Sequence, residues 1–159
     1  MSSAQTARPA RIEICPLPSG SKLWTEVGRG DFIDGYAVQS PLSARVAADI
    51  GLSLPGWAGA LLALRNRLVR PLGLKTEVSN TGSGAIFPTT HEDATEVILG
   101  TDDRHLNFRI CVRQEAGRVH MATWVRRNNA LGRFYLAAVM PFHVLIVRDA
   151  MRRIARATP

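Results

Sequence analysis

The stretch LNFRICVRQEAGRVHMATWVRR, residues 106–127, decides the fold. In each half of it, apolar and polar side chains alternate, which is the period of a half-buried β-strand. EAGR, residues 115–118, is a short glycine-containing turn, so the two halves are predicted to form an antiparallel hairpin. The register that follows puts Val112 opposite Met121, Ile110 opposite Thr123, Phe108 opposite Val125, Arg113 opposite His120 and Arg109 opposite Trp124.

The sequence before the hairpin predicts a strand, two helices and a further strand. Residues 31–40 have strand spacing and end at Pro41, and Ser43 suits the N-cap of a short helix over 44–51. Residues 55–69 carry Trp57, Leu61, Leu64 and Leu68 on one helical face. Residues 79–94 read as a loop around a short strand at 85–87, Glu96–Leu99 begins a strand, and GTDDRH, residues 100–105, reads as a turn.

The end of the chain is predicted to be a long amphipathic helix. Residues 128–132 form a loop, residues 134–139 add a first turn or two, and Pro141 opens a helix that runs to Arg156. Its expected apolar stripe consists of Phe142, Leu145, Ile146, Met151 and Ile154. The order of elements indicates an α+β fold of helix-grip type, in which a curved antiparallel sheet wraps around the C-terminal helix.

Length and composition indicate one domain. The chain has 159 residues, of which we expect 1–16 to be a flexible N-terminal tail and 17–159 a single helix-grip domain. No signal peptide is predicted, and the apolar run from Phe134 to Val147 is shorter than the roughly 20 residues of a membrane span. Cys15 and Cys111 lie far apart with no CxxC motif, which favours a cytoplasmic protein without a disulfide framework.

The positive charge is concentrated in the last third of the chain. Residues 1–103 hold nine Lys/Arg and eleven Asp/Glu, a net of −2, whereas the rest holds eleven Arg and two acids, a net of +9. A clustered positive field attracts polyanions. No nucleic-acid-binding motif accompanies it, so solvated arginine-rich faces are the favoured interpretation and nucleic acid is not an expected partner.

Three stretches carry a family resemblance: WAGALLALRNRLVRPLGL (57–74), GTDDRHLNFRICV (100–112) and NNALGRFYLAAVMPFHVLIVRDAMRRI (128–154). They resemble an uncharacterised bacterial domain-of-unknown-function family that is similar to the START and polyketide-cyclase superfamily, over residues 17–156. The resemblance implies a helix-grip fold with a pocket between the sheet and the last helix. It carries no reaction over to this chain.

The residues expected to line such a pocket are Tyr36, Phe108, Met121, Thr123, Tyr135 and His143. All except His143 are explained better by an ordinary core. His143 lies close to the apolar stripe, where an imidazole can bind a ligand or act as a general acid or base. The alternative is a buried histidine that bonds to a backbone carbonyl or to Tyr135, because no carboxylate lies near it in sequence and Asp149 is nearly two turns further on.

Two other polar groups have structural explanations. Asp102, Asp103 and His105 offer metal-ligand atoms, as do His91, Glu92 and Asp93, but consecutive aspartates before a strand are more often turn formers. Arg109 opposite Trp124 is an ordinary stacking pair. The sequence predicts neither a metal nor a cofactor.

Three functions follow as hypotheses. The first is a protein without membrane association that binds a small apolar or aromatic molecule between sheet and C-terminal helix. The second is a cyclase or isomerase type of enzyme that uses His143 with Tyr135 or Thr123. The third is a basic interaction protein that binds polyanions through its arginine-rich C-terminal third.

Overall fold

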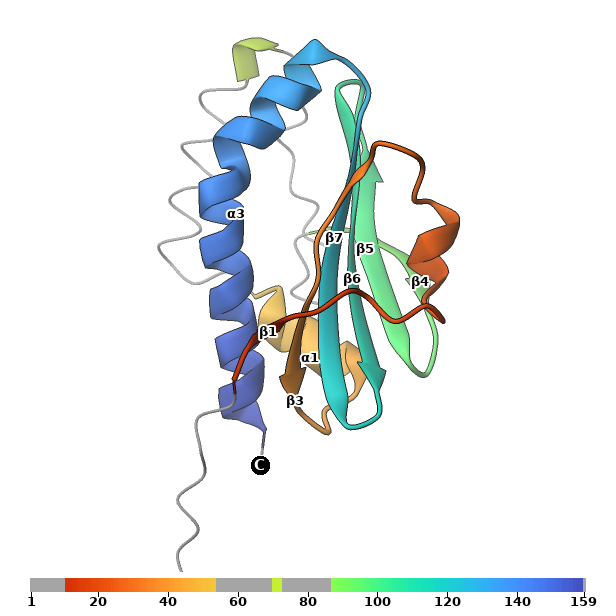
Figure 1. The fold of residues 1–159 in the computed structure, drawn as a ribbon, viewed down its shortest axis with the longest axis vertical. Coiled ribbons are helices and arrows are strands. Elements are labelled where there is room, and N and C mark those ends of the chain that lie inside the picture. Colours follow the sequence, from red (N-terminus) through yellow and green to blue (C-terminus); the bar gives the residue numbers. More distant parts are fainter. Residues whose placement is uncertain (1–10, 54–69, 73–86, 159) are drawn as a thin grey trace, which may run out of the picture.

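The computed structural model describes residues 11–53, 70–72 and 87–158. Figure 1 shows one sheet with the C-terminal helix across one of its faces. The elements are β1 (Glu13–Ile14), η1 (Lys22–Thr25), β2 (Phe32–Ile33), β3 (Tyr36–Gln39), α1 (Ala44–Gly51), η2 (Arg70–Leu72), β4 (Thr89–Glu92), β5 (Glu96–Asp102), β6 (Leu106–Glu115), β7 (Arg118–Arg127) and α3 (Ala130–Ala157). The predicted helix over 55–69 and most of the predicted strand over 85–87 lie outside the described residues.

The sheet is antiparallel, and the hairpin of β6 and β7 is its centre. The strand order is β1-β3-β7-β6-β5-β4, and β2 also pairs with β7. Every cross-strand pair predicted for the hairpin is present, including Ile110 opposite Thr123. The turn places Ala116 and Gly117 at positive φ. The prediction of an α+β fold with an antiparallel sheet and a C-terminal helix is therefore confirmed.

The strand bounds differ from the prediction at three places. The strand predicted over 31–40 is broken into β2 and β3. Residues 100–102, predicted as a turn, continue β5, so that Asp102 pairs with Asn107 and the turn is confined to 103–105. Residues 89–92, predicted as a loop, form the edge strand β4; it is short and polar, so the alternation that identifies a half-buried strand is missing.

Helix α3 begins earlier than predicted and contains a proline. Asn129 is its N-cap and accepts from the backbone N–H of Gly132, so that the predicted loop over 128–132 ends at Asn129. Pro141, predicted as the first helical residue, lies inside the helix. Proline removes one backbone hydrogen bond and kinks a helix, and Figure 1 shows α3 bending between its N-terminal part and its longer C-terminal part.

The face of α3 that packs on the sheet matches the predicted stripe only in its C-terminal part, where Met151 and Ile154 are buried. Phe142 and Leu145 are 48% and 58% exposed. The buried residues of α3 are Gly132, Leu136, Val147, Ala150, Met151 and Ile154. By length and composition α3 also meets the criterion for a membrane-spanning helix, one that core helices of soluble proteins meet as well.

Both faces of the sheet are covered. Helices α1 and α3 lie on one face, where Met121 and Ile154 belong to the main core together with residues of β3, β5 and β6. The segment with η1 lies on the other face, where Leu23 and Trp124 belong to a second cluster, and Figure 1 shows η1 on the side of the sheet away from α3. Strand β1 pairs with β3, so Glu13 and Ile14 belong to the sheet.

Candidate functional site

A break in the ladder between β2 and β7 positions a carboxylate. Ile33 pairs with Trp124 and Tyr36 with Met121, but the two residues between them leave the strand geometry. The backbone N–H of Asp34 donates to the Thr123 carbonyl at 3.1 Å, and Asp34 Oδ1 accepts from the Thr123 N–H at 2.9 Å. The Asp34 carboxylate thus takes the place of a backbone carbonyl as the acceptor for Thr123. The residue is held through both its backbone N–H and its side chain.

Gly35 allows this break. A Cβ on Gly35 would lie 2.2 Å from the carbonyl oxygen of Cys15, so the residue has to be glycine while the Cys15 N–H donates to the Gly35 carbonyl. This hydrogen bond ties the residue that follows β1 against the break. With Oδ1 of Asp34 bonded to the Thr123 N–H, Oδ2 faces α3.

That oxygen meets His143. His143 Nε2 and Asp34 Oδ2 lie 2.7 Å apart, and the two side chains are 20% and 17% exposed. A carboxylate that accepts the Nε2–H fixes the tautomer of an imidazole and leaves Nδ1 as the nitrogen that can accept a proton. The alternative that His143 bonds to a backbone carbonyl or to Tyr135 was based on the absence of a carboxylate near it in sequence, and the partner Asp34 lies 109 residues away.

Two aromatic side chains complete the surroundings of the pair. The ring of Phe32 meets the His143 ring edge to face, with centroids 6.3 Å apart at 82°. Tyr36 is 6% exposed. Burial, reinforced by the negative charge of Asp34 and opposed by the positive charge of Arg148, raises the pKa of Tyr36. Tyr36 is therefore a neutral phenol, and it belongs to the main core.

The residues predicted to line a pocket all lie at the helix-covered side of the sheet. Tyr36 and Met121 belong to the main core. Phe108 and Tyr135 pack against a smaller cluster that includes Leu136. Thr123 is 7% exposed, and its backbone holds Asp34. The structure thus brings Thr123 and His143 to one carboxylate; the role of these six residues as ligand contacts stays a prediction.

Asp34 was missed because residues 31–40 were interpreted as one continuous strand. Only one local signal marks the break: the Asp-Gly pair at 34–35 in the middle of a strand pattern. A glycine in such a pattern often indicates close approach of another backbone. The direction of the Asp34 side chain and its partner on α3 depend on the tertiary fold.

The turn before β6 contacts the N-terminus of α3. His105, predicted on the polar side of the strand, is 6% exposed, and its Nδ1 lies 2.9 Å from Nδ2 of the N-cap Asn129. Asp102 pairs with Arg109 at 2.8 Å. Arg109 lies over Trp124 as predicted, 5.9 Å from the ring centroid. These contacts give the stretch 102–105 a structural role.

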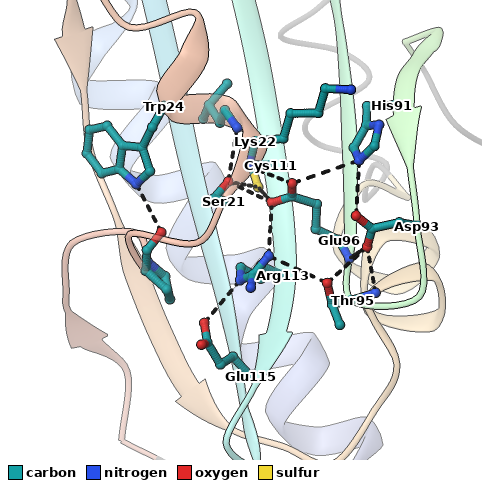
Figure 2. A network of polar contacts seen from close by, with 12 residues as sticks. Ser21, Lys22, Trp24, His91, Asp93, Thr95, Glu96, Cys111, Arg113 and Glu115 are labelled. Carbon is teal, nitrogen blue, oxygen red and sulfur yellow. Dashed lines mark hydrogen bonds and ion pairs between the residues drawn. The ribbon is translucent and has the colours of Figure 1, made fainter.

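A second polar network lies on the opposite face of the sheet and centres on Glu96 (Figure 2). Glu96 is 1% exposed. Its Oε1 accepts from the backbone N–H of Lys22 at 2.7 Å, and its Oε2 accepts from the Ser21 hydroxyl at 2.6 Å and lies 3.6 Å from Arg113 Nη1. The carboxylate thereby ties η1 to β5 and β6.

Cys111 belongs to this network as a thiol. Its Sγ donates to Glu96 Oε2 at 3.4 Å. Burial raises the pKa of the Cys111 thiol to about 12. A thiol with so high a pKa is a weak nucleophile near neutral pH, because the thiolate is the reactive form. Both cysteines of the chain are free.

One comparison identifies the chain. A family model described as "Protein of unknown function (DUF2867)" matches residues 27–150. The chain belongs to this family. The matched residues include both members of the Asp34–His143 pair and the whole of the second network except its contacts from η1. No curated protein and no solved structure matches the chain.

Several arginines of this DUF2867 chain are held by carboxylates. Arg118 pairs with Glu13, Arg126 with Asp31 and Arg153 with Asp149. Arg126 also lies over Trp124, 5.1 Å from the ring centroid. Such pairs neutralise part of the positive excess of the last third of the chain, which the sequence alone left as a possible polyanion site.

Proposed function

We propose that the protein binds a small apolar or aromatic molecule between the sheet and α3, in a fold of the START-like helix-grip type. One observation carries the proposal: the Asp34–His143 contact of 2.7 Å lies at the edge of an otherwise apolar face. Small-molecule sites are mostly apolar, with a few placed polar groups that fix the orientation of the ligand. His143 is the group that recognises a hydrogen-bonding or acidic substituent.

The surroundings of the pair support this assignment. The Phe32 ring packs edge to face on His143, Tyr36 is buried nearby, and Thr123 holds Asp34 through its backbone. Asp34 is locked to β7 by two hydrogen bonds, so His143 is oriented before a ligand arrives. Preorganisation of this kind lowers the entropic cost of binding.

Fluorescence titration with 1-anilinonaphthalene-8-sulfonate, an apolar aromatic anion, tests the proposal. The wild-type chain is expected to bind the dye saturably, and His143→Asn is expected to bind it about 10 to 100-fold more weakly, because a hydrogen bond to a charged group contributes about 1.5–3 kcal/mol. His91→Gln, a histidine change on the far face of the sheet, is the matched control. Equal binding by wild type and His143→Asn contradicts the proposal.

Proton transfer is a second candidate function for the same site, and the orienting carboxylate is the observation that favours it. A histidine held by a carboxylate is the arrangement of a general base, with Nδ1 as the accepting atom. NMR detection of α-proton exchange of 1-tetralone in D2O tests it. Exchange above background that is lost in both His143→Asn and Asp34→Asn supports catalysis, whereas dye binding without exchange restricts the site to binding.

A further inference from the structure

A set of three metal-ligand atoms lies on the hairpin of β4 and β5, remote from the Asp34–His143 pair. His91 Nε2, Asp93 Oδ2 and Glu96 Oε1 belong to side chains whose ligand atoms all lie within 4.8 Å of one another. His91 Nε2 lies 3.1 Å from Asp93 Oδ2 and 4.0 Å from Glu96 Oε1. In a tetrahedral site with bonds of about 2.1 Å, two ligand atoms are about 3.4 Å apart. The set is therefore close to metal-binding dimensions without rearrangement of the backbone.

The hairpin fixes Asp93 in the orientation that such a site needs. Its Oδ1 accepts from the backbone N–H of Thr95 at 2.8 Å, from the Thr95 hydroxyl at 2.9 Å and from the N–H of Glu96 at 2.9 Å. These bonds, the first of them above all, together with His91, hold the pKa of Asp93 well below its usual range. Oδ2 is left to face His91, as Figure 2 shows.

Glu96 is held equally firmly from the other side. Its Oε2 forms an ion pair with Arg113 and accepts a hydrogen bond from the Ser21 hydroxyl. Its Oε1 accepts one hydrogen bond, from the Lys22 N–H, and faces His91. A carboxylate oxygen has two lone pairs, so Oε1 retains one for a cation. Glu96 is 1% exposed, which makes it a ligand that the fold has already desolvated.

The ligand types select the class of metal. An imidazole nitrogen with two carboxylate oxygens suits a divalent transition ion, whereas Ca²⁺ and Mg²⁺ prefer oxygen ligands alone. Asp93 is 48% exposed and His91 23% exposed, so the ion has access from solvent and keeps room for water as a fourth ligand.

We infer that His91, Asp93 and Glu96 form a binding site for one divalent transition-metal ion, of which Zn²⁺ is the representative, on the face of the sheet opposite α3. The ion replaces the proton between His91 and Asp93 and joins the edge hairpin to the buried carboxylate that holds η1. The site is independent of the proposed ligand site.

Isothermal titration of the chelator-treated full chain with ZnCl2 tests the inference. One saturable Zn²⁺ site per chain is expected, with CaCl2 and MgCl2 giving no comparable binding. His91→Gln and Asp93→Asn each remove one ligand atom, while the asparagine keeps an oxygen for the three bonds of Oδ1. Both are expected to weaken Zn²⁺ binding at least about 100-fold, because loss of even an outer partner costs about 10 to 100-fold.

Two further variants make the result specific. Thr95→Val removes one bond to Asp93 Oδ1 and is expected to weaken Zn²⁺ binding about tenfold. His143→Asn removes a histidine from the other face and is expected to keep the wild-type affinity, and circular dichroism checks that each variant is folded. Absence of saturable Zn²⁺ binding, wild-type affinity in both His91→Gln and Asp93→Asn, or Ca²⁺ binding as tight as that of Zn²⁺ overturns the inference.

Discussion

His143 on α3 and Asp34 between β2 and β3 are 109 residues apart in sequence and 2.7 Å apart in the fold. The contact joins the C-terminal helix to the one place where the β2–β3 segment leaves the ladder of β7. A strand that continued through residues 34 and 35 would have paired its backbone with Thr123 and offered no carboxylate oxygen to the helix. The break in the sheet and the position of the histidine therefore belong to one arrangement.

The first prediction concerns the stability that Asp34 contributes. Asp34→Ala leaves the Thr123 N–H and the His143 ring without their acceptor, and we expect a loss of about 1–3 kcal/mol in the free energy of unfolding. Asp34→Asn keeps an oxygen for the Thr123 N–H and should lose less. Urea denaturation measures both, and an alanine variant as stable as wild type would refute the locking role of Asp34.

The second prediction compares two carboxylates that share Arg113. Glu96 is buried and holds Ser21 and Lys22, so Glu96→Ala is expected to destabilise the fold by about 3 kcal/mol. Glu115, 45% exposed and 3.0 Å from Arg113 Nε, is the matched control, and Glu115→Ala should cost less than about 1 kcal/mol. Denaturant midpoints give the difference in stability between the two variants. Similar losses in the free energy of unfolding would contradict the claim that Glu96 stabilises the fold by holding η1.

The third prediction concerns pH. Burial lowers the pKa of His120, and the positive charges of Arg118 and Arg113 lower it further against the opposing charge of Glu115. Because the folded chain takes up the proton less readily than the unfolded chain, stability is expected to fall as the pH drops below the ordinary histidine pKa of 6.5. In His120→Gln this contribution should be absent. Denaturation between pH 7.5 and 5 measures the slope, and an identical slope in the variant would count against it.

The fourth prediction separates packing from helix propensity at Gly132. Alanine in a helix is ordinarily favoured over glycine by about 1 kcal/mol. At this position a Cβ would lie 2.0 Å from the carbonyl oxygen of His105, which also accepts from the Asn128 N–H. Gly132→Ala is therefore expected to destabilise the fold by about 1–3 kcal/mol. A thermal midpoint equal to or above that of wild type would show that close packing of Gly132 against the His105 carbonyl does not stabilise the fold.

The hairpin could be predicted in full because its signals are local. Alternation over 106–127 and a four-residue turn determine which residue faces which, so a pair such as Val112 and Met121 follows from the spacing alone. The edge strand β4 could not be predicted, because a short polar edge strand carries no alternation. The start of α3 was misplaced since Pro141 is a typical first helical residue, whereas here the helix continues through it with a bend.

The candidate site could be predicted only in part. His143 was identified because it lies close to the predicted apolar stripe, of which Met151 and Ile154 are buried while Phe142 and Leu145 are exposed. Asp34 and Glu96 could not be found, because each acquires its partners from segments far away in sequence. Which carboxylate meets which histidine depends on the tertiary fold.

The most direct test of the central claim is a 1H–15N NMR titration of the full chain with 1-anilinonaphthalene-8-sulfonate. The claim that a ligand binds between the sheet and α3 beside the Asp34–His143 pair predicts saturable shifts that are largest at Asp34, Thr123 and His143. Residues of the far face, such as Glu96 and Arg113, should change little. Shifts confined to that far face, or no saturable shifts at Asp34 and His143, would contradict the claim.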